Sequence, residues 1–167
     1  MSIVDLLDCF KTLQATGRFV DENQFDCDAC KDKKDAEWRV TLQRRPPSLL
    51  ISFRRTLWDR VKGLYKDSRR VNFPIELDAS DLLGIGNEKT PDDDFEGCHY
   101  RLVAVVSHSG SSPFVGHYIC YAADSNNDNK WSLFNDSSVT PATEANVLEV
   151  EAFILLYERQ TIPSINE

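Results

Sequence analysis

The sequence predicts an α+β fold in which one leading helix precedes a mostly antiparallel β domain. Apolar residues recur at helical spacing near the N-terminus. After Gly17 the chain turns to short segments that are rich in β-branched and aromatic residues and bounded by turn-forming residues. No repeat and no long linker divides the 167 residues. We therefore expect one domain over residues 1–160, followed by a short tail over residues 161–167.

The leading helix is predicted over residues 2–16. Its apolar residues share one helical face and are Ile3, Leu6, Leu7, Phe10 and Leu13. Ser2 is suited to cap the N-terminus of this helix, and Gly17 is suited to cap its C-terminus. Cys9 lies at the flank of the apolar face, where we expect a small buried side chain.

The strands are predicted from alternation and from β-branched and aromatic content. The expected segments are 38–43, 49–53, 71–73, 100–106, 116–121, 131–134 and 153–157. Residues 54–70 are basic and polar, and we expect an exposed hairpin tip or loop there. Residues 84–97 combine glycines, a proline and an acidic run, which is typical of a flexible loop.

Charge and cysteine content narrow the functional classes. The net charge of −8, from 27 acidic and 19 basic residues, argues against a nucleic-acid-binding protein. No apolar run approaches the roughly 20 residues of a membrane helix, and the N-terminus lacks the pattern of a secretory signal. Five irregularly spaced cysteines disfavour a disulfide framework. We expect reduced thiols and an intracellular location in cytoplasm or nucleus, without a membrane or nucleic-acid partner.

The candidate catalytic segment is a hairpin over residues 116–139. Its middle is dense in Asn, Asp and Ser, which favours a loop centred near Asn126. That centre places His117 directly opposite Asn135, with Cβ atoms about 4.5–5.5 Å apart. Two further pairs share this sheet face, Ile119 with Leu133 and Tyr121 with Trp131. An imidazole nitrogen of His117 can then hydrogen-bond the amide oxygen of Asn135.

This arrangement matches a base and its orienting group in nucleophilic catalysis. A histidine held through one ring nitrogen keeps the other nitrogen free to accept a proton. Asp136 is expected on the opposite face unless the strand bulges, and a slip of one residue in register would exchange it with Asn135. A lone histidine on a strand is more often inert and satisfied by its neighbours. From the residues alone, both interpretations of His117 stay open.

Ordered blocks along the chain carry a family resemblance. They are residues 7–10 (LDCF), 22–30 (ENQFDCDAC), 46–55 (PPSLLISFRR), 71–74 (VNFP), 77–78 (LD), 100–106 (YRLVAVV), 116–118 (GHY), 131–136 (WSLFND) and 152–159 (AFILLYER). In this order they resemble the ubiquitin-specific protease family of cysteine proteases, from about residue 5 to residue 159. The blocks GHY and WSLFND resemble the two boxes of the family that hold the catalytic histidine and its partner.

The resemblance implies a papain-like fold of fingers, palm and thumb. This chain would supply part of the fingers and most of the palm, as the C-terminal half of the catalytic domain. His117 would be the general base, Asn135 its orienting residue and Asp136 a nearby polar helper. The residues implied to bind the ubiquitin tail are Gly110, Gly116 and Tyr118, on or beside a mobile closing loop over residues 109–116.

The chain departs from the family in its cysteines. The family's box with the nucleophilic cysteine has no counterpart in these 167 residues, and none of the five cysteines follows a strand and opens a helix. Cys27 and Cys30 form one C-x-x-C pair, which is half of a four-ligand zinc site. We therefore assign no cofactor, and expect zinc only if a missing half or a partner supplies a second C-x-x-C.

Three functions follow from the resemblance. The first is part of a cysteine-type deubiquitinase that hydrolyses ubiquitin–protein isopeptide bonds and is inactive as this chain alone. The second is a catalytically dead scaffold that binds ubiquitin or another partner. The third is a β-rich interaction module that keeps only the fold. The expected partners are ubiquitin or a ubiquitinated protein and, for the first function, an upstream half-domain with the cysteine box. The pair of His117 and Asn135 favours the first.

Overall fold

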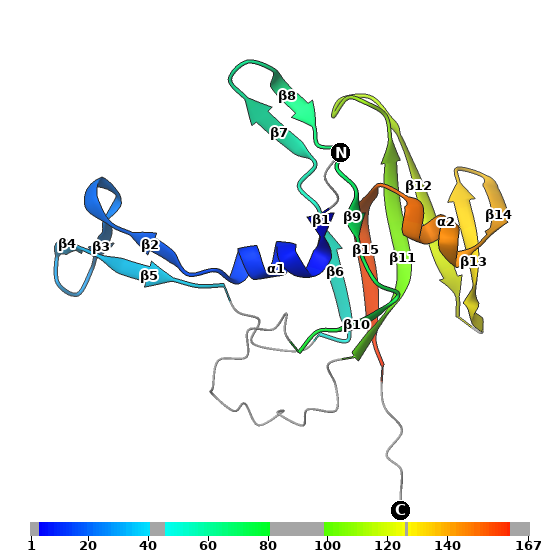
Figure 1. The fold of residues 1–167 in the computed structure, drawn as a ribbon, viewed down its shortest axis with the longest axis horizontal. Coiled ribbons are helices and arrows are strands. Elements are labelled where there is room, and N and C mark those ends of the chain that lie inside the picture. Colours follow the sequence, from blue (N-terminus) through cyan, green and yellow to red (C-terminus); the bar gives the residue numbers. More distant parts are fainter. Residues whose placement is uncertain (1–3, 41–45, 81–98, 126, 161–167) are drawn as a thin grey trace, which may run out of the picture.

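A computed structural model describes residues 4–40, 46–80, 99–125 and 127–160. Figure 1 shows a central β-sheet, an arm that extends away from it, and a hairpin, β7–β8, that projects beside the sheet. The predicted fold class, α+β with mostly antiparallel strands and a leading helix, is confirmed. The predicted loop over 84–97, the tail over 161–167, Ser2 and Cys98 lie outside the described residues.

Within the described ranges the central sheet has seven strands in the order β14-β13-β12-β11-β15-β6, with β10 also paired to β11. They are β6 (Ser48–Ser52), β10 (Glu76–Asp78), β11 (His99–Ser109), β12 (His117–Asp124), β13 (Asn127–Asn135), β14 (Ser138–Ala142) and β15 (Ala152–Arg159). Every neighbouring pair in this sheet is antiparallel. The long strand β11 therefore supports the candidate hairpin β12–β13 on one side and β15 on the other.

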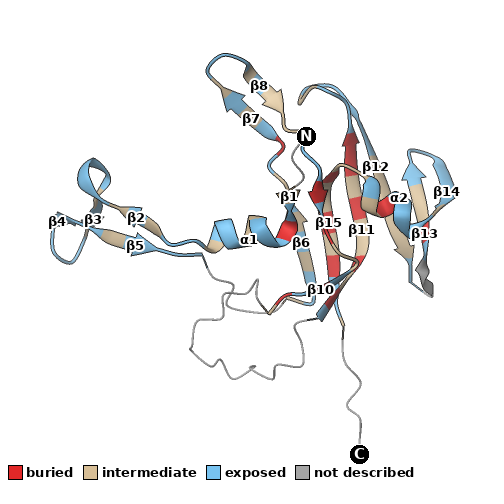
Figure 2. Cartoon of the chain, in the orientation of Figure 1, coloured by how far each residue is buried: buried red, intermediate tan, exposed pale blue. Residues whose placement is uncertain are grey.

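In the described residues, four two-stranded sheets lie outside the central sheet. They pair β1 (Val4–Asp5) with β9 (Val71–Asn72), β2 (Gly17–Phe19) with β5 (Ala36–Trp38), β3 (Phe25–Cys27) with β4 (Asp32–Lys34), and β7 (Thr56–Asp59) with β8 (Gly63–Lys66). A 3-10 helix, η1 (Asp21–Asn23), precedes β3. The arm consists of the leading helix and β2 to β5, and Figure 2 shows that it is exposed or half-buried over most of its length. Local strand pairing, rather than core packing, holds the strands β2 to β5 of the arm together.

The leading helix is shorter than the sequence predicts. It is α1 (Leu6–Gln14) instead of residues 2–16. Asp5 replaces Ser2 as the N-cap, because its Oδ1 accepts a hydrogen bond from the N–H of Leu7 at 2.9 Å. Gly17 begins β2 and does not cap the helix. The helix starts late because the residues before it form β1 and pair with β9, a contact distant in sequence that helical periodicity cannot reveal.

The apolar face of α1 is buried only at its start. Leu6 is 1% exposed, whereas Leu7 is 38% and Leu13 is 53% exposed. Cys9 is half-buried, and burial is the main cause that raises the pKa of its thiol. The expectation of a buried Cys9 is thus met only in part. The spacing of apolar residues correctly predicts which side chains share one face of the helix. After Leu6 that face is exposed or half-buried because the arm extends away from the central sheet.

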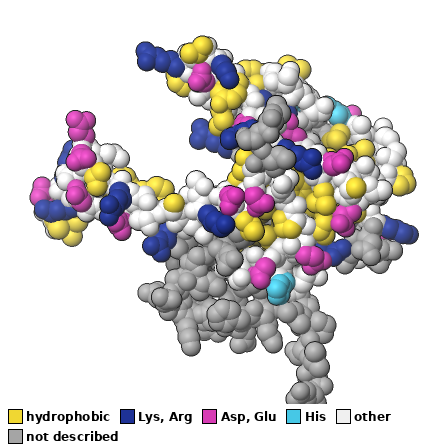
Figure 3. Space-filling view, in the orientation of Figure 1, with side chains coloured by type: hydrophobic (Ala, Val, Ile, Leu, Met, Phe, Trp, Pro, Cys, Tyr) yellow, Lys and Arg dark blue, Asp and Glu magenta, His cyan; other side chains and the backbone are white. Residues whose placement is uncertain are grey.

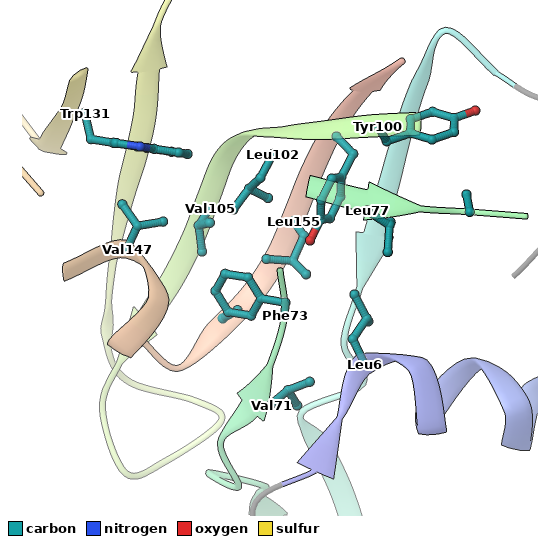
Figure 4. Close-up of a cluster of buried hydrophobic side chains, with 13 residues drawn as sticks. Leu6, Val71, Phe73, Leu77, Tyr100, Leu102, Val105, Trp131, Val147 and Leu155 are labelled. Atoms are coloured by element: carbon teal, nitrogen blue, oxygen red, sulfur yellow. The ribbon is translucent and has the colours of Figure 1, made fainter. Parts of the chain in front are cut away.

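The hydrophobic core lies around β11 and β15 and under β9, β10 and the second helix, α2 (Glu144–Glu149) (Figure 4). Its buried members are Leu6, Val71, Phe73, Leu77, Ala79, Tyr100, Leu102, Val105, Trp131, Val147, Ala152, Leu155 and Tyr157. The buried side of β11 changes from Leu102 to Val105, because a register shift against β15 lies between Leu102 and Ala104. Tyr157 satisfies its hydroxyl by donating to the carbonyl of Pro74 at 2.6 Å. These buried side chains form one cluster that includes residues of β11, the strand that supports β12.

Two elements near the C-terminus were not predicted, β14 and α2. The side chain of Thr143 caps α2 by accepting from the N–H of Asn146 at 3.2 Å, and Val147 anchors the helix in the core. A six-residue helix shows less than two turns of periodicity, so tertiary contact rather than pattern defines it. Neither α1 nor α2, the α-helices of the described part, is long and apolar enough to cross a membrane.

The hairpin β7–β8 exposes large apolar side chains. Trp58 is 68%, Val61 is 93% and Leu64 is 50% exposed. Figure 3 shows hydrophobic side chains on this hairpin, and acidic and basic side chains intermixed on the arm. The predicted exposed hairpin over residues 54–70 is therefore confirmed in outline. Arg55 in the same segment is an exception, because it is only 4% exposed.

Arg55 joins the base of the β7–β8 hairpin to the central sheet. Its Nε and Nη2 donate to the carbonyl of Ala152 at 3.0 and 2.6 Å, and its Nη1 donates to the carbonyls of Asp67 and Arg69. Burial lowers the pKa of Arg55, while Glu151 and Asp67 act in the opposite direction. One guanidinium thus satisfies three carbonyls from two separate segments of the chain.

We expect the stabilising contribution of Asp67 to be lost at acidic pH. Its carboxylate accepts from the Arg69 guanidinium, which lowers the pKa of Asp67 although burial opposes this. A carboxyl whose folded-state pKa is depressed stabilises above its unfolded pKa of about 3.9, and that contribution is lost as pH falls through the lower folded-state pKa. Asp67→Asn should therefore lower the free energy of unfolding by about 1 kcal/mol at pH 6, and by less at pH 2.5. Urea denaturation at both pH values checks this, with the exposed Asp8→Asn as control; a loss that does not change with pH would contradict it.

Candidate active site

His117 and Asn135 meet at the end of the β12–β13 hairpin. His117 is the first residue of β12 and Asn135 the last residue of β13. The distance between His117 Nε2 and Asn135 Oδ1 is 2.6 Å. Because an amide oxygen only accepts, Nε2 carries the proton in this contact and Nδ1 is left as the basic nitrogen. The side chain of His117 is 46% exposed, so it can be reached from outside this chain.

The predicted register of this hairpin is wrong by two residues. The structure pairs Tyr121 with Leu133, where the sequence predicts Tyr121 opposite Trp131. The shift arises at an irregularity between Ala123 and Asp124, where β13 carries more residues than β12 before regular pairing begins. A shift of two keeps every side chain on its predicted face. His117 and Asn135 therefore contact each other diagonally rather than directly across the ladder.

Asp136 also approaches the histidine. It lies in the turn between β13 and β14 with a positive φ of 51°, and its Oδ2 is 3.7 Å from His117 Nε2. The expectation that Asp136 points to the opposite face is wrong, because the residue has left the strand and adopts a turn conformation. Two side-chain oxygens thus lie near one ring nitrogen. The catalytic roles of His117, Asn135 and Asp136 stay predictions.

Two glycines shape the loop that precedes His117. Gly110 has a positive φ of 146°, and a Cβ there would lie 2.7 Å from the carbonyl oxygen of Val115. A Cβ on Gly116 would lie 2.1 Å from Nε2 of His108. Both positions therefore require glycine, since real side chains do not make such short contacts. The structure supports a backbone role for these two residues, while their proposed contact with a ubiquitin tail stays a prediction.

Tyr118, the residue after His117, belongs to an aromatic cluster. Its ring centroid lies 4.7 Å from that of His108 and 5.6 Å from that of Phe153. His108 is 7% exposed, whereas Tyr118 is 54% exposed. Phe153 enters the cluster at a second irregularity of β15 against β11, between Val106 and Ser107. The rings of His108 and Phe153 thus support the exposed Tyr118 ring, while its proposed contact with a ubiquitin tail stays a prediction.

None of the cysteines in the described residues lies where it could act as a nucleophile together with His117. Cys120 lies on β12 three residues after His117, so its side chain points to the other face of the strand. It is half-buried, and burial raises the pKa of its thiol. Cys9 lies within α1, and Cys27 and Cys30 lie in the arm. Cys98 is outside the described residues.

Cys27 and Cys30 share a tight turn between β3 and β4. The backbone N–H groups of Cys30 and Ala29 point at the sulfur of Cys27 and lower the pKa of its thiol. Lys31 closes the turn with a positive φ of 54° and an N–H to Cys27 carbonyl hydrogen bond of 2.7 Å. In the described part of the chain, no group of three or more His, Cys, Asp and Glu side chains could hold a metal. A zinc site that uses Cys27 and Cys30 as two of its four ligands stays a prediction.

Sequence reasoning missed Lys66 and Glu151. The Nζ of Lys66 lies 2.7 Å from the carbonyl oxygen of His108 and 2.8 Å from Glu151 Oε1. Nothing in the segment distinguishes Lys66 from the exposed Lys62 four residues earlier. The buried position of Lys66 becomes visible only in the folded chain, where its own segment meets those of His108 and Glu151.

Comparisons with known proteins agree with one another. The model of the family described as ubiquitin carboxyl-terminal hydrolase matches residues 8–157. Ubiquitin carboxyl-terminal hydrolase 15 of Homo sapiens is 33% identical over 158 residues, which cover 94% of this chain and 15% of the relative. Ubiquitin carboxyl-terminal hydrolase 3 of Mus musculus is 32% identical over 160 residues, which cover 95% and 29%. The chain thus spans less than a third of the length of these two relatives.

Solved structures show the same fold. The SAGA Ubp8/Sgf11/Sus1/Sgf73 DUB module bound to ubiquitin aldehyde contains a chain that is similar with a TM-score of 0.74 and 22% identity. The match covers 96% of this chain and 36% of that chain. A second structure, of the Ubp8-Sgf11-Sgf73-Sus1 SAGA DUB module, has a TM-score of 0.72 and 22% identity, and the match covers 93% of this chain and 31% of that chain. These likenesses establish the fold of the described residues.

Proposed function

Because this chain belongs to the ubiquitin carboxyl-terminal hydrolase family, we propose that it is part of a cysteine-type deubiquitinase, to which it supplies the catalytic histidine and its orienting residue. The observation that carries the proposal is the 2.6 Å contact between His117 Nε2 and Asn135 Oδ1 at the accessible end of the β12–β13 hairpin. This contact leaves the other ring nitrogen of an accessible histidine available as a base, which supports the proposal. The nucleophilic cysteine is proposed to lie on a segment outside these 167 residues.

His117 would act twice in this reaction. Its Nδ1 takes the proton of the cysteine thiol, and the thiolate attacks the isopeptide carbonyl carbon of the last residue of the ubiquitin tail. The imidazolium then gives this proton to the leaving lysine amine as the carbon–nitrogen bond breaks, which leaves a thioester that water hydrolyses. Asn135 would hold the Nε2–H throughout, so that the ring keeps one tautomer and one orientation.

Ubiquitin is the proposed partner at this site. The names of the relatives support a ubiquitin C-terminal substrate, and one solved relative is bound to ubiquitin aldehyde. Gly110, Gly116 and Tyr118 are proposed to line the path of the ubiquitin tail. They lie close to His117 along the chain, and Phe114 and Val115 between the two glycines are 72% and 75% exposed. Exposed apolar side chains beside a base are suited to a substrate that covers them.

The test uses a chimera of this chain and a relative, which we call the exchanged protein. The matching region of Homo sapiens ubiquitin carboxyl-terminal hydrolase 15 is replaced by this chain, and turnover of a fluorogenic ubiquitin C-terminal substrate is measured. We expect turnover by this exchanged protein and none by the chain alone. Turnover by the chain alone would contradict the proposal that the nucleophile lies elsewhere. A folded but inactive exchanged protein would contradict the catalytic role.

A binding function is the second candidate. It is favoured by the position of the described cysteines, since Cys120 faces away from His117 and the other three lie in the arm. In this case the chain would bind ubiquitin or another partner without catalysis. Titration of the inactive exchanged protein with labelled ubiquitin distinguishes the two candidates, because binding without turnover is expected only for the second.

The choice of orienting residue is testable. Asn135→Ala removes the 2.6 Å contact, whereas Asp136→Ala removes a carboxylate at 3.7 Å. A hydrogen bond to a charged group contributes about 1.5–3 kcal/mol, so Asn135→Ala should lower the kcat of the exchanged protein about 10- to 100-fold. Asp136→Ala should have a smaller effect. The reverse order of the two kcat values would identify Asp136 as the orienting residue.

Zinc binding is proposed only for an assembly that provides four ligands. Cys27 and Cys30 supply two, and a second C-x-x-C would come from another segment or a partner. Cobalt titration followed by its thiolate absorption should show tight binding only in such an assembly, and Cys27→Ser should abolish it. Tight tetrahedral binding by this chain alone would contradict the proposal.

A further inference from the structure

The ammonium group of Lys66 is buried at the junction of three segments. Its side chain is 3% exposed, although it ends the projecting hairpin strand β8. Its Nζ donates to the carbonyl of His108 at 2.7 Å and to the carbonyl of Gly110 at 2.8 Å. The third partner is Glu151 Oε1 at 2.8 Å. An ammonium has three N–H donors, so these acceptors satisfy all of them.

The carboxylate side of this junction is also held in place. Glu151 directly precedes β15, and its carbonyl accepts from the Ser107 hydroxyl at 2.9 Å. The next residue, Ala152, receives the Arg55 guanidinium. Glu151 is 27% exposed, so the ion pair is only partly screened by water. The start of β15 is thus a rigid support against which Lys66 is fixed.

The two carbonyls bound by Lys66 lie at the base of the loop that leads to His117. Ser109 and His117 pair across β11 and β12, so this loop comprises residues 110–116. Gly110 and Gly116 come together there, and the His108 ring packs against Gly116. Moving the carbonyl of His108 or Gly110 would therefore move the backbone that immediately precedes His117.

We propose that Lys66 is a positioning residue, which fixes the base of the 110–116 loop and thereby the orientation of His117. The catalytic part of this inference rests on the proposed function. The polar partners of Lys66 are the carbonyls of His108 and Gly110 and the carboxylate of Glu151, so we infer that it acts on His117 through the backbone of the loop. It also connects the exposed β7–β8 hairpin to the loop, since Lys66 pairs with Thr56 across that hairpin.

A lysine is needed at this position for chemical reasons. A neutral side chain of similar length would remove the donor that two backbone carbonyls and one carboxylate share, and the bond to the His108 carbonyl is part-buried. An arginine is also unsuitable, because its planar guanidinium spreads its donors over three nitrogens, whereas here three acceptors surround one nitrogen. Loss of the ammonium is therefore expected to loosen the loop base, while the core around β11 and β15 lies elsewhere and remains packed.

The first experiment measures hydrogen exchange in the full chain and needs no activity. Lys66→Met should speed amide exchange of residues 109–117 at least about tenfold, with little change in β15 and β6. The matched control is Lys62→Met in the same hairpin, since Lys62 is exposed and lies 5.3 Å from the Tyr65 ring centroid. If Lys66→Met fails to fold, Glu151→Gln keeps an acceptor but removes the charge, and it should give a smaller acceleration in the same residues.

The second experiment separates positioning from general stability. In the exchanged protein, measured well below its unfolding temperature, Lys66→Met should lower kcat about 10- to 100-fold with a smaller change in KM. Lys62→Met should leave both unchanged. Unchanged exchange in residues 109–117 would overturn the proposal, as would unchanged kcat in an active exchanged protein. If the unsubstituted exchanged protein is inactive, the proposed function fails, and hydrogen exchange still decides whether Lys66 fixes the loop.

Discussion

Replacing His117 with alanine is expected to lower the kcat of the exchanged protein by about 10³-fold or more. His117 is proposed both to take the thiol proton and to protonate the leaving amine, so its loss removes both steps. Its side chain is 46% exposed and lies at the end of a hairpin, which means that the substitution removes little core packing. Loss of the hydrogen bond to Asn135 should lower the free energy of unfolding by about 1 kcal/mol or less.

The measurement compares turnover of the fluorogenic ubiquitin substrate with binding of intact ubiquitin. Binding by His117→Ala should remain within about threefold of the unsubstituted protein, because the imidazole is proposed to act in the chemical step. His99→Ala is the matched control, since His99 is also exposed and begins a strand of the same sheet. Turnover of His117→Ala close to that of His99→Ala would remove His117 from the reaction and favour the binding function.

Replacing Arg55 with methionine is expected to give the largest loss of stability. The substitution fills part of the same volume but leaves the carbonyls of Ala152, Asp67 and Arg69 without their donor. Breaking a buried network of this kind costs about 3–5 kcal/mol, against a total stability of about 5–15 kcal/mol for a typical domain. Much of the chain should therefore be unfolded in mild urea.

Two variants test the cause of this loss. Arg55→Lys keeps the charge but cannot reach several carbonyls with one planar group, so it should still cost about 2 kcal/mol. Arg54→Met is the matched control, because Arg54 is the exposed neighbour in sequence, and it should change stability by less than about 0.5 kcal/mol. Urea denaturation followed by tryptophan fluorescence measures all three. A loss for Arg55→Met no larger than that for Arg54→Met would show that the carbonyls are satisfied in another way.

The sequence by itself determined the types of the main elements and the face on which His117 and Asn135 lie. Alternation has a period of two along a strand, so it assigns a side chain to a face without any knowledge of the partner strand. That is why an error of two residues in register left the pair on one face and in contact. The family resemblance likewise depends on ordered local blocks, and the match to residues 8–157 confirms it.

Only the tertiary structure decided the details that hold the site. The irregularity near Ala123 sets the register, and the turn conformation of Asp136 brings its carboxylate toward His117. The buried positions of Arg55 and Lys66 depend on segments far apart in the sequence. The sequence alone therefore cannot distinguish them from the exposed Arg54 and Lys62. Periodicity reports which way a side chain points from its own backbone. Which distant groups meet it depends on how the chain closes, because a polar side chain is stabilised in the interior by partners that no local pattern records.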